Sequence, residues 1–420
     1  MKKVAVIGTG IAGMAAARMF RNWADITIYE QNNYVGGHTN TVFIEEGDRT
    51  VPIDSGFIVC NRENYPLLMR LFTQLEVPLK PTSMSFSAIH EADNIEYGGS
   101  NLNQLFAQRR NLFSPRYIRF LMHVNRFNAI CPEVLEDDDL GNLTIAEYAR
   151  HRELGNDFLK WYILPMSAAL WSTPISTTEQ FPVRSLVRFF KNHGLLGLNT
   201  QFQWYTVDGG SEVYKQRLIE SFRTAIRLES KVVSVAETEN GATVTTMDGQ
   251  TEHYDEVVIA THADQALSLL TQPTDLQQAL LAPFRYQVNA TVLHTDASLM
   301  PERKLVWSSW NYRITRKDQQ GVCTYWMNKL QGVSDRENYF VTLNGEDLIS
   351  PDKVLRTFQY EHPIFTVAAM QAQHDLPLLN QQGHIFFCGS YFRNGFHEDA
   401  LRSAVDLATL KAPNGIDIWS

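Results

Sequence analysis

The chain has 420 residues, of which 44% are hydrophobic, and its formal net charge at pH 7 is −9. This length predicts two or three domains, and the acidic balance argues against a general nucleic-acid binder. No run of about 18 apolar residues is present, so no transmembrane helix is expected. Four scattered cysteines show no metal-ligand spacing, so we expect reduced thiols, no bound metal and a cytoplasmic protein.

The first 30 residues have the pattern of a dinucleotide-binding unit. A short β-branched run at 4–7 predicts a buried strand, and residues 14–21 are rich in helix formers. Between them lies Gly-x-Gly-x-x-Gly at 8–13, whose glycines allow a tight turn and let the backbone approach a pyrophosphate. A second strand pattern ends in Glu30, at the spacing of an acid that binds a ribose hydroxyl. The predicted dinucleotide contacts are Gly8, Gly10, Ile11, Ala12, Gly13 and Glu30. Because glycines interrupt the apolar run, a secretion signal is not favoured.

The loop after Glu30 adds a second set of candidate phosphate contacts. It carries Gly36 and Gly37, followed by His38 and Thr39. Paired glycines allow the loop to fold back over the phosphates, where a hydroxyl such as that of Thr39 can donate a hydrogen bond.

These motifs resemble those of the flavin-containing amine oxidase and phytoene desaturase superfamily, which carries Gly-Gly-[Arg/His]-x-x-[Ser/Thr] at this point. Segments 53–57, 206–211, 228–235, 255–261 and 385–408 resemble further parts of that superfamily. The resemblance implies non-covalent FAD. The additional contacts that it implies are Gly36, Gly37, His38, Thr39, Gly56, Phe57, Val232, Gly389, Phe396, His397 and Glu398.

The resemblance also implies an α/β fold in which a Rossmann-like FAD-binding domain is interleaved with an α+β substrate domain. The first domain takes residues 1–80, 202–270 and 381–415, and the second takes 81–201 and 271–380. Within 81–201 the pattern is mostly helical. Ser114-Pro115 is a typical helix start, and Thr144 to Glu147 is a capping box. Strand-like composition at 286–294, 321–328 and 338–344 predicts a mixed sheet with helices on one side.

Four positions depart from the wider superfamily. His38 replaces a common arginine, and Ala400 and Ala404 stand where glycines are frequent. Phe396 occupies the place of a tyrosine in the aromatic cage of amine oxidases, so the ring is kept and the hydroxyl is lost. The last difference weakens an assignment as an amine oxidase.

A second resemblance is carried by the stretches 55–72, 83–87, 261–267 and 395–404. They resemble bacterial NAD/FAD-binding proteins associated with lipid methyltransferases of the cyclopropane-fatty-acid-synthase type. That resemblance implies an apolar substrate, a fatty acyl chain or lipid, which the enzyme dehydrogenates by hydride transfer to flavin. Two alternatives stay open. One is a redox-neutral isomerase that moves a double bond in a fatty acid, and the other is a non-catalytic flavoprotein partner of a methyltransferase.

The final helix pattern, which starts near Gly395, carries the candidate catalytic residues His397 and Glu398. In the superfamily this helix points its N-terminus at the flavin, where its positive end stabilises developing negative charge. The aromatic stretch 158–174 either lines an acyl tunnel or forms helix core. The stretch 186–198 either packs inside or touches the inner face of a membrane through Phe189, Phe190, Leu195 and Leu196. Aromatic clusters at 307–313 and 324–328 either cover the flavin or simply pack.

Overall fold

The computed structural model describes residues 1–171, 174–197, 202–316 and 321–420. A five-stranded parallel sheet has the order β10-β2-β1-β14-β20. Its strands are β10 (Ile226–Arg227), β2 (Ala24–Tyr29), β1 (Lys2–Ile7), β14 (Glu256–Ile259) and β20 (Ile385–Phe387). Segments from the start, middle and end of the chain therefore lie side by side in one sheet, as the α/β interleaving predicts.

Side chains of β1 alternate between two hydrophobic cores. Val4 and Val6 face α1 (Ile11–Phe20) and α16 (His397–Lys411), whereas Ala5 and Ile7 face the opposite side. The opposite side is covered by the antiparallel sheet of β11 (Val232–Thr238), β12 (Gly241–Thr246) and β13 (Thr251–Tyr254), and by α12 (Ala263–Leu269) and α13 (Asp275–Leu281). Because both faces are covered, the near-continuous apolar run of β1 is what a central parallel strand requires.

A mixed seven-stranded sheet forms the second layer, with the order β19-β15-β18-β17-β16-β7-β8. Its strands are β7 (Phe86–His90), β8 (Ile95–Gly98), β15 (Arg285–His294), β16 (Trp310–Ile314), β17 (Gly321–Trp326), β18 (Phe340–Leu343) and β19 (Val354–Ile364). The strands expected in the second insertion are confirmed. Two strands inside the insertion expected to be mostly helical, β7 and β8, were missed because β7 is stabilised by a distant partner, β16, with which it pairs in parallel.

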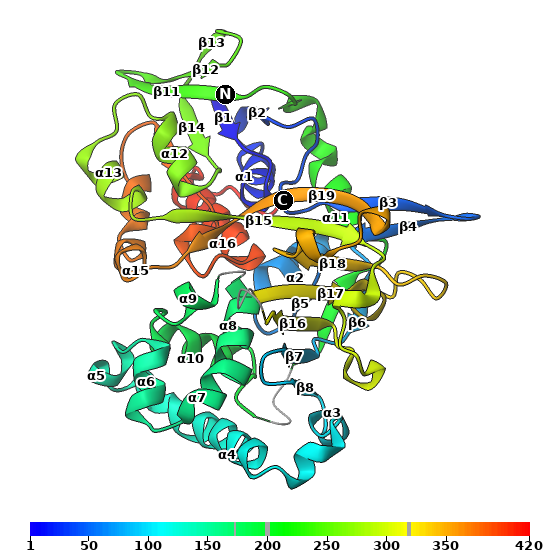
Figure 1. Cartoon of the computed structure of the whole chain (residues 1–420). Coiled ribbons are helices and arrows are strands. Elements are labelled where there is room, and N and C mark those ends of the chain that lie inside the picture. The colour runs from blue at the N-terminus through cyan, green and yellow to red at the C-terminus, as the bar shows by residue number, and fades with distance from the viewer. Residues whose placement is uncertain (172–173, 198–201, 317–320) are drawn as a thin grey trace.

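Helices of the first insertion form a separate lobe at the lower end of Figure 1. Helix α4 (Pro115–Ile130) starts at the predicted proline, and the Ser114 hydroxyl accepts the N–H of Tyr117 at 3.3 Å. Helix α6 (Ile145–His151) starts with the predicted capping box of Thr144 and Glu147. A π-helical turn at Leu159–Ile163 leads into α8 (Leu164–Trp171), and α10 (Val183–Asn192) packs nearby.

The remaining helices and strands join these layers. They are β3 (Thr41–Glu46), β4 (Arg49–Asp54), β5 (Cys60–Asn61), α2 (Pro66–Gln74), β6 (Leu79–Thr82), α3 (Leu102–Leu105), α5 (Asp138–Gly141), α7 (Gly155–Phe158), α9 (Ile175–Thr178), β9 (Trp204–Val207), α11 (Glu212–Ile219), α14 (Met327–Leu330) and α15 (Val367–Gln373). None of the helices in the described ranges is long and apolar enough to span a membrane.

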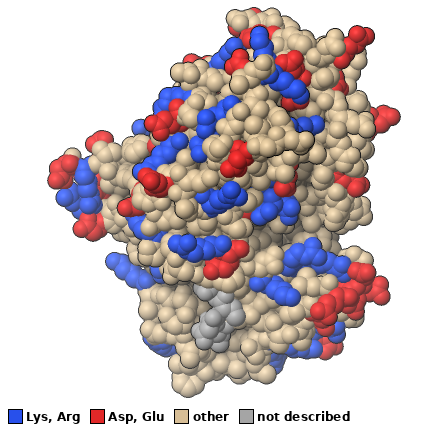
Figure 2. Space-filling view, turned by 180° about the vertical axis from the view of Figure 1, so that it is seen from behind, with Lys and Arg blue, Asp and Glu red and all other residues tan. Residues whose placement is uncertain are grey.

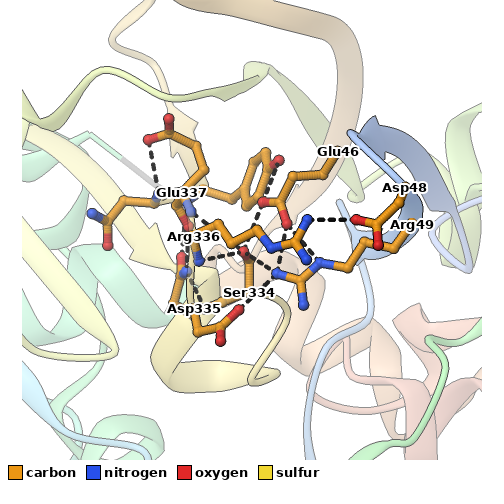
Figure 3. A network of polar contacts seen from close by, with 10 residues as sticks. Glu46, Asp48, Arg49, Ser334, Asp335, Arg336 and Glu337 are labelled. Atoms are coloured by element: carbon orange, nitrogen blue, oxygen red, sulfur yellow. Dashed lines mark hydrogen bonds and ion pairs between the residues drawn. The ribbon is translucent and has the colours of Figure 1, made fainter.

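Polar contacts tie the β3–β4 hairpin to the loop before β18 (Figure 3). The guanidinium of Arg49 lies 2.8 Å from the carboxylate of Asp335 and donates to the Ser334 hydroxyl at 2.8 Å. Arg336 pairs with Asp48 at 2.6 Å. These groups are largely exposed, so each pair contributes little alone, and the network chiefly sets the direction of the hairpin.

A buried carboxylate at the end of β4, that of Asp54, joins segments from both domains. It accepts hydrogen bonds from the backbone N–H of Ser211 at 2.9 Å and from the side-chain amide of Gln331 at 2.6 Å. The Thr41 hydroxyl also donates to it. Burial raises the pKa of Asp54 to about 6, because no cation compensates the charge among these partners.

We expect Gly13→Ala to destabilise the protein. A Cβ on Gly13 would overlap the carbonyl oxygen of Gly8, so α1 would have to move off the sheet. Backbone overpacking of this kind costs about 3 kcal/mol. The matched control is Gly10→Ala, whose Cβ would meet no atom within 4 Å. Urea denaturation of the FAD-free variants measures the difference, and equal midpoints for the two variants would contradict the packing role of Gly13.

Candidate active site

One large cavity runs between the parallel sheet, the mixed sheet and the helical lobe. Its volume is about 1760 Å³, which exceeds the range of roughly 300–1,000 Å³ typical of small-molecule sites. One end is lined by Gly8 and Gly10, and the other by the α4 residues Phe120 and Leu121. The cavity is therefore large enough for a dinucleotide and a second molecule together.

The glycine-rich loop and the start of α1 form the wall at the dinucleotide end. Gly8 has φ of +100°, and a Cβ there would lie 2.9 Å from the carbonyl oxygen of Ala260. Gly10 is the N-cap of α1 and supplies no side-chain cap, so the first N–H groups of the helix, on Ile11 and Ala12, depend on another acceptor. Both residues line the cavity, whereas Gly13 lies behind it against Gly8.

Glu30 follows β2 and lines the same end of the cavity. Its carboxylate accepts the backbone N–H of Thr9 at 3.1 Å and that of Asn32 at 2.9 Å, and the Thr9 hydroxyl donates to it as well. The side-chain amide of Asn32 donates to it too, at 2.9 Å. These four donors match the about four lone-pair sites of a carboxylate, so they orient the group, and a ligand hydroxyl would have to share or replace one of them.

His38 and Thr39 occupy different environments although they are neighbours. The His38 imidazole lines the cavity and lies against the Tyr360 ring, 4.7 Å between centroids, and its buried Nε2 has no hydrogen-bond partner. Burial holds the pKa of His38 well below 6.5, so the ring is neutral. The Thr39 hydroxyl instead contacts Tyr214 and His397 and does not line the cavity. The expectation that Thr39 donates to a phosphate therefore has no support in this geometry, because its hydroxyl already has protein partners.

The loop after β4 and the start of α16 form the middle of the cavity wall. Gly56 and Phe57 line it, and the Phe57 ring stacks on the His397 imidazole with centroids 4.0 Å apart. The Nε2 atom of His397 lies 2.6 Å from the Tyr214 hydroxyl. Burial lowers the pKa of His397 to about 3, so the imidazole is neutral and held in place at neutral pH.

Glu398 points away from the cavity. Its carboxylate accepts the backbone N–H groups of Leu67 at 3.1 Å and Leu68 at 2.9 Å, in the first turn of α2, and it pairs with Arg402 at 3.0 Å. These contacts join α16 to α2. Glu398 does not line the cavity, so the catalytic and cofactor roles expected for it have no support in this geometry. The other expected contacts on these elements, Val232, Gly389 and Phe396, do line the cavity.

Beyond Phe396 the cavity continues as an apolar arm between the mixed sheet and the helical lobe. Among the described residues that line this arm there is no Asp, Glu, Lys or Arg. They are Met84, Ser85, Phe86, Tyr97, Gly99, Ser100, Leu102, Leu105, Phe120, Leu121, Val124, Asn125, Asn128, Ala129, Tyr162, Met166, Leu170, Trp171, Phe189, His193, Leu195, Leu196, Gly197, Trp204, Trp310, Tyr325 and Leu343.

The structure separates the roles of the aromatic stretches. In 158–171 one set of side chains, including Tyr162 and Met166, lines the arm. Phe158 is buried in the core of the helical lobe, and Trp161 is buried in the core shared with the mixed sheet. Residues 172–173 of this stretch lie outside the described part. Trp310 and Tyr325 line the arm, whereas Trp307 and Trp326 pack on each other.

The stretch 186–197 is turned inward. Phe189 and Phe190 are buried, so neither is available for the membrane contact considered for them, and Leu195 and Leu196 line the cavity. Leu198 lies outside the described residues. The amphipathic pattern of this stretch therefore reflects packing against the cavity and the lobe core.

A group of residues opposite the glycine-rich loop had no predicted role. His262 follows β14, and its Nδ1 lies 3.0 Å from the Glu361 carboxylate on β19. His362, next to Glu361, lies beside His38 with ring centroids 5.2 Å apart. All line the cavity. The sequence signals near His262 were the resemblances of 255–261 and 261–267 to known proteins, and neither carries information about β19.

The model of the flavin-containing amine oxidoreductase family matches residues 11–410. The chain belongs to this family. No curated protein matches the sequence. Solved structures with the same fold include a putrescine oxidase variant, at 13% identity and a TM-score of 0.68, and cyclohexylamine oxidase from Brevibacterium oxydans, at 16% and 0.67. A fatty acid isomerase from P. acnes that produces CLA shares 12% identity, with a TM-score of 0.67. In each case 97% of this chain and 98% of the other are covered.

Membership in this family implies a flavin cofactor, and the cavity fits a flavin dinucleotide. A Cβ added to Gly10 would meet no atom within 4 Å, so there is open space beside this residue. The first N–H groups of α1 lack a side-chain cap, and the buried Nε2 of His38 lacks a hydrogen-bond partner. An anionic group beside them would supply acceptors for these donors. Among the described residues no group of three His, Cys, Asp or Glu could hold a metal ion.

We expect Glu30→Ala to weaken FAD binding. Charge-assisted hydrogen bonds of the kind expected from Glu30 to the ribose are worth about 1.5–3 kcal/mol, or roughly tenfold to a hundredfold in Kd. Equilibrium dialysis of FAD measures the change, with circular dichroism as a check on the fold. Unchanged affinity would show that the carboxylate only organises Thr9 and Asn32.

We expect His397 to reduce acid stability. Between pH 6.5 and about 3 the unfolded chain binds a proton at this imidazole and the folded chain does not, so stability falls as pH falls. Between pH 7 and pH 4 the free energy of unfolding of His397→Asn should fall by about 3 kcal/mol less than that of the wild type. Denaturation of FAD-free protein at both pH values measures this, with the exposed His151→Asn as control. Equal losses in His397→Asn and wild type would contradict the burial of a neutral ring.

Proposed function

We propose that the protein is an FAD-dependent oxidoreductase that dehydrogenates a fatty acyl chain or lipid. The observation that supports this most directly is the apolar arm, which joins the dinucleotide end of the cavity at Phe396 and, among the described residues, has no ionised carboxylate, ammonium or guanidinium in its lining. An alkyl chain has no polar group that must be desolvated when it enters such a space, and the removal of its apolar surface from water is favourable.

The same arm is unfavourable for a protonated amine. Transfer of a cation into an apolar site costs several kcal/mol unless a carboxylate or an equivalent partner compensates it. Glu30 lies at the dinucleotide end, and Glu361 is engaged by His262. Phe396 provides an aromatic face without a hydroxyl, packed on Phe189 with centroids 5.2 Å apart.

FAD, when bound, supplies the hydride acceptor. The residues of the chain then have separate tasks. The N–H groups of Ile11 and Ala12 would bind the pyrophosphate, and Glu30 would bind the ribose. The N-terminus of α16 reaches the cavity at Phe396 and His397, where its positive end would stabilise developing negative charge. His397 is a positioning residue, because Tyr214 and Phe57 hold its ring in place against the wall and burial keeps it neutral.

The bacterial proteins associated with lipid methyltransferases support the same substrate class by resemblance, and they make a methyltransferase a candidate partner. A fatty acid isomerase has the same fold, but at 12% identity that likeness carries the fold alone. The isomerase and the accessory flavoprotein are therefore alternative outcomes of the test.

The test begins with lipid extracts and defined fatty acids added anaerobically to the yellow protein. A dehydrogenase loses its flavin absorbance in proportion to added substrate, and mass spectrometry finds a product lighter by two hydrogens. An isomerase returns a product of equal mass without lasting bleaching. If the flavin is not bleached and no product is found, the proposal of catalysis is overturned and the accessory role remains.

Leu121→Asp tests whether the apolar arm holds the chain. Leu121 lines the arm, and a carboxylate there should weaken binding of the fluorescent fatty acid cis-parinaric acid by about tenfold or more. FAD content should stay that of the wild type. The control is Met247→Asp, an exposed position on the β12–β13 turn. Equal affinities for both variants would overturn the assignment of the arm to an alkyl chain.

A further inference from the structure

The surface around α3 and the start of α4 exposes large apolar side chains. Phe113 is 88% exposed, Leu102 is 73% exposed and Met122 is 65% exposed, and Leu112 and Ile118 are exposed beside them in the chain. We call residues 102–126 the α3–α4 surface. Large hydrophobic residues gathered at one place on a folded protein mark a surface that meets an apolar partner.

The same surface carries uncompensated positive charge. Residues 97–132 contain no Asp or Glu but five arginines, in a chain whose net charge is −9. Arg109 and Arg110 donate only to neutral oxygens, on Asn103, Phe106 and Asn94. Arg116 pairs with Asp157 and Asp93. Arg119 and Arg126 have no carboxylate within ion-pair distance among the described residues.

The α3–α4 surface surrounds one opening of the cavity. Leu102, Asn125 and Ala129 are solvent-exposed and also line the cavity, so the end of the apolar arm opens between α3 and α4. On α4, Leu121 and Val124 face the cavity while Ile118 and Met122 face solvent. One helix therefore separates the arm from the exposed apolar side chains.

We infer that the α3–α4 surface docks on an anionic lipid bilayer and that the acyl substrate enters the cavity through this opening. Apolar side chains at a tip flanked by arginines match a membrane interface, where the apolar side chains lie below the headgroups and the guanidinium groups meet phosphates. A nucleic acid would not compensate the exposure of Leu112, Phe113 and Met122. The route of entry rests on the proposed lipid substrate, whereas the docking does not.

The position of this surface suits the role. Helices α3 and α4 lie at the lower end of Figure 1, opposite the β11–β13 sheet, so nothing else in the described chain extends past them there. From behind, Figure 2 shows a lower tip that is largely uncharged, with acidic side chains gathered at one lower edge away from it. The membrane contact is thereby placed on 102–126 and not on the buried side chains of 186–197.

Co-sedimentation of the FAD-loaded protein with vesicles tests the docking. The protein should bind vesicles of phosphatidylcholine with phosphatidylglycerol and release them as salt rises, and it should bind pure phosphatidylcholine at least tenfold more weakly. Phe113→Asp should weaken binding by about tenfold, from lost burial of the ring, and R119Q/R126Q by about tenfold or more. The controls are Met247→Asp for the apolar change and K3Q/R356Q for the charge change, all exposed positions.

Three results would overturn the docking. One is no partition onto the anionic vesicles, and another is equal binding by Phe113→Asp and Met247→Asp. The third is a dimer in sedimentation equilibrium that Phe113→Asp dissociates while vesicles stay unbound, which would assign the surface to a second copy of the chain. Because partition is measured without turnover, vesicle binding with no lipid substrate would defeat the proposed function alone.

Discussion

The close approach of α1 to the ends of β1 and β14 is the constraint on which the site depends. Gly13 packs on Gly8, and Gly8 lies against the carbonyl of Ala260, with no room for a side chain at either glycine. This contact places the N-terminus of α1 directly above the carboxyl ends of the parallel strands. In open α/β sheets ligands bind at that edge, because loops from several strands and a helix dipole meet there. Glu30, Ala260 and Gly389 reach the cavity for the same reason, since each follows a strand of this sheet.

Because the two domains are interleaved, segments that are distant in the chain must also be held together around one cavity. The Asp54 carboxylate contributes to this with hydrogen bonds to Thr41, Ser211 and Gln331, from three separate parts of the chain. The pairing of β7 with β16 joins the two insertions into one sheet. The exposed network of Figure 3 orients the β3–β4 hairpin but contributes little to the free energy of folding. Buried polar contacts and strand pairing therefore hold the walls of the cavity together.

Electrostatics divide the cavity into two environments. At the dinucleotide end, carboxylate, backbone N–H groups and imidazoles provide donors and acceptors, yet burial keeps the imidazoles of His38, His362 and His397 neutral. A neutral imidazole can donate one hydrogen bond and accept another without the cost of an isolated buried charge. In the apolar arm, ionised groups are absent from the described lining. The change in polarity occurs near Phe57, Phe396 and His397, where the two parts join.

The sequence by itself determined the dinucleotide unit, because its signals are local. The glycine spacing, the strand pattern before it and the acid after β2 lie within 30 residues, and the helix starts at Pro115 and Thr144 follow from cap chemistry alone. Only the tertiary structure decided which way side chains point and what distant segments they meet. Glu398 and Thr39 stand beside cavity residues in the chain but bond to α2 and Tyr214, because those elements arrive from elsewhere. Strand β7 forms against a partner more than 200 residues away, and the group of His262, Glu361 and His362 exists only where the segment after β14 contacts β19. Burial and long-range pairing are properties of the folded chain, and no local pattern contains them.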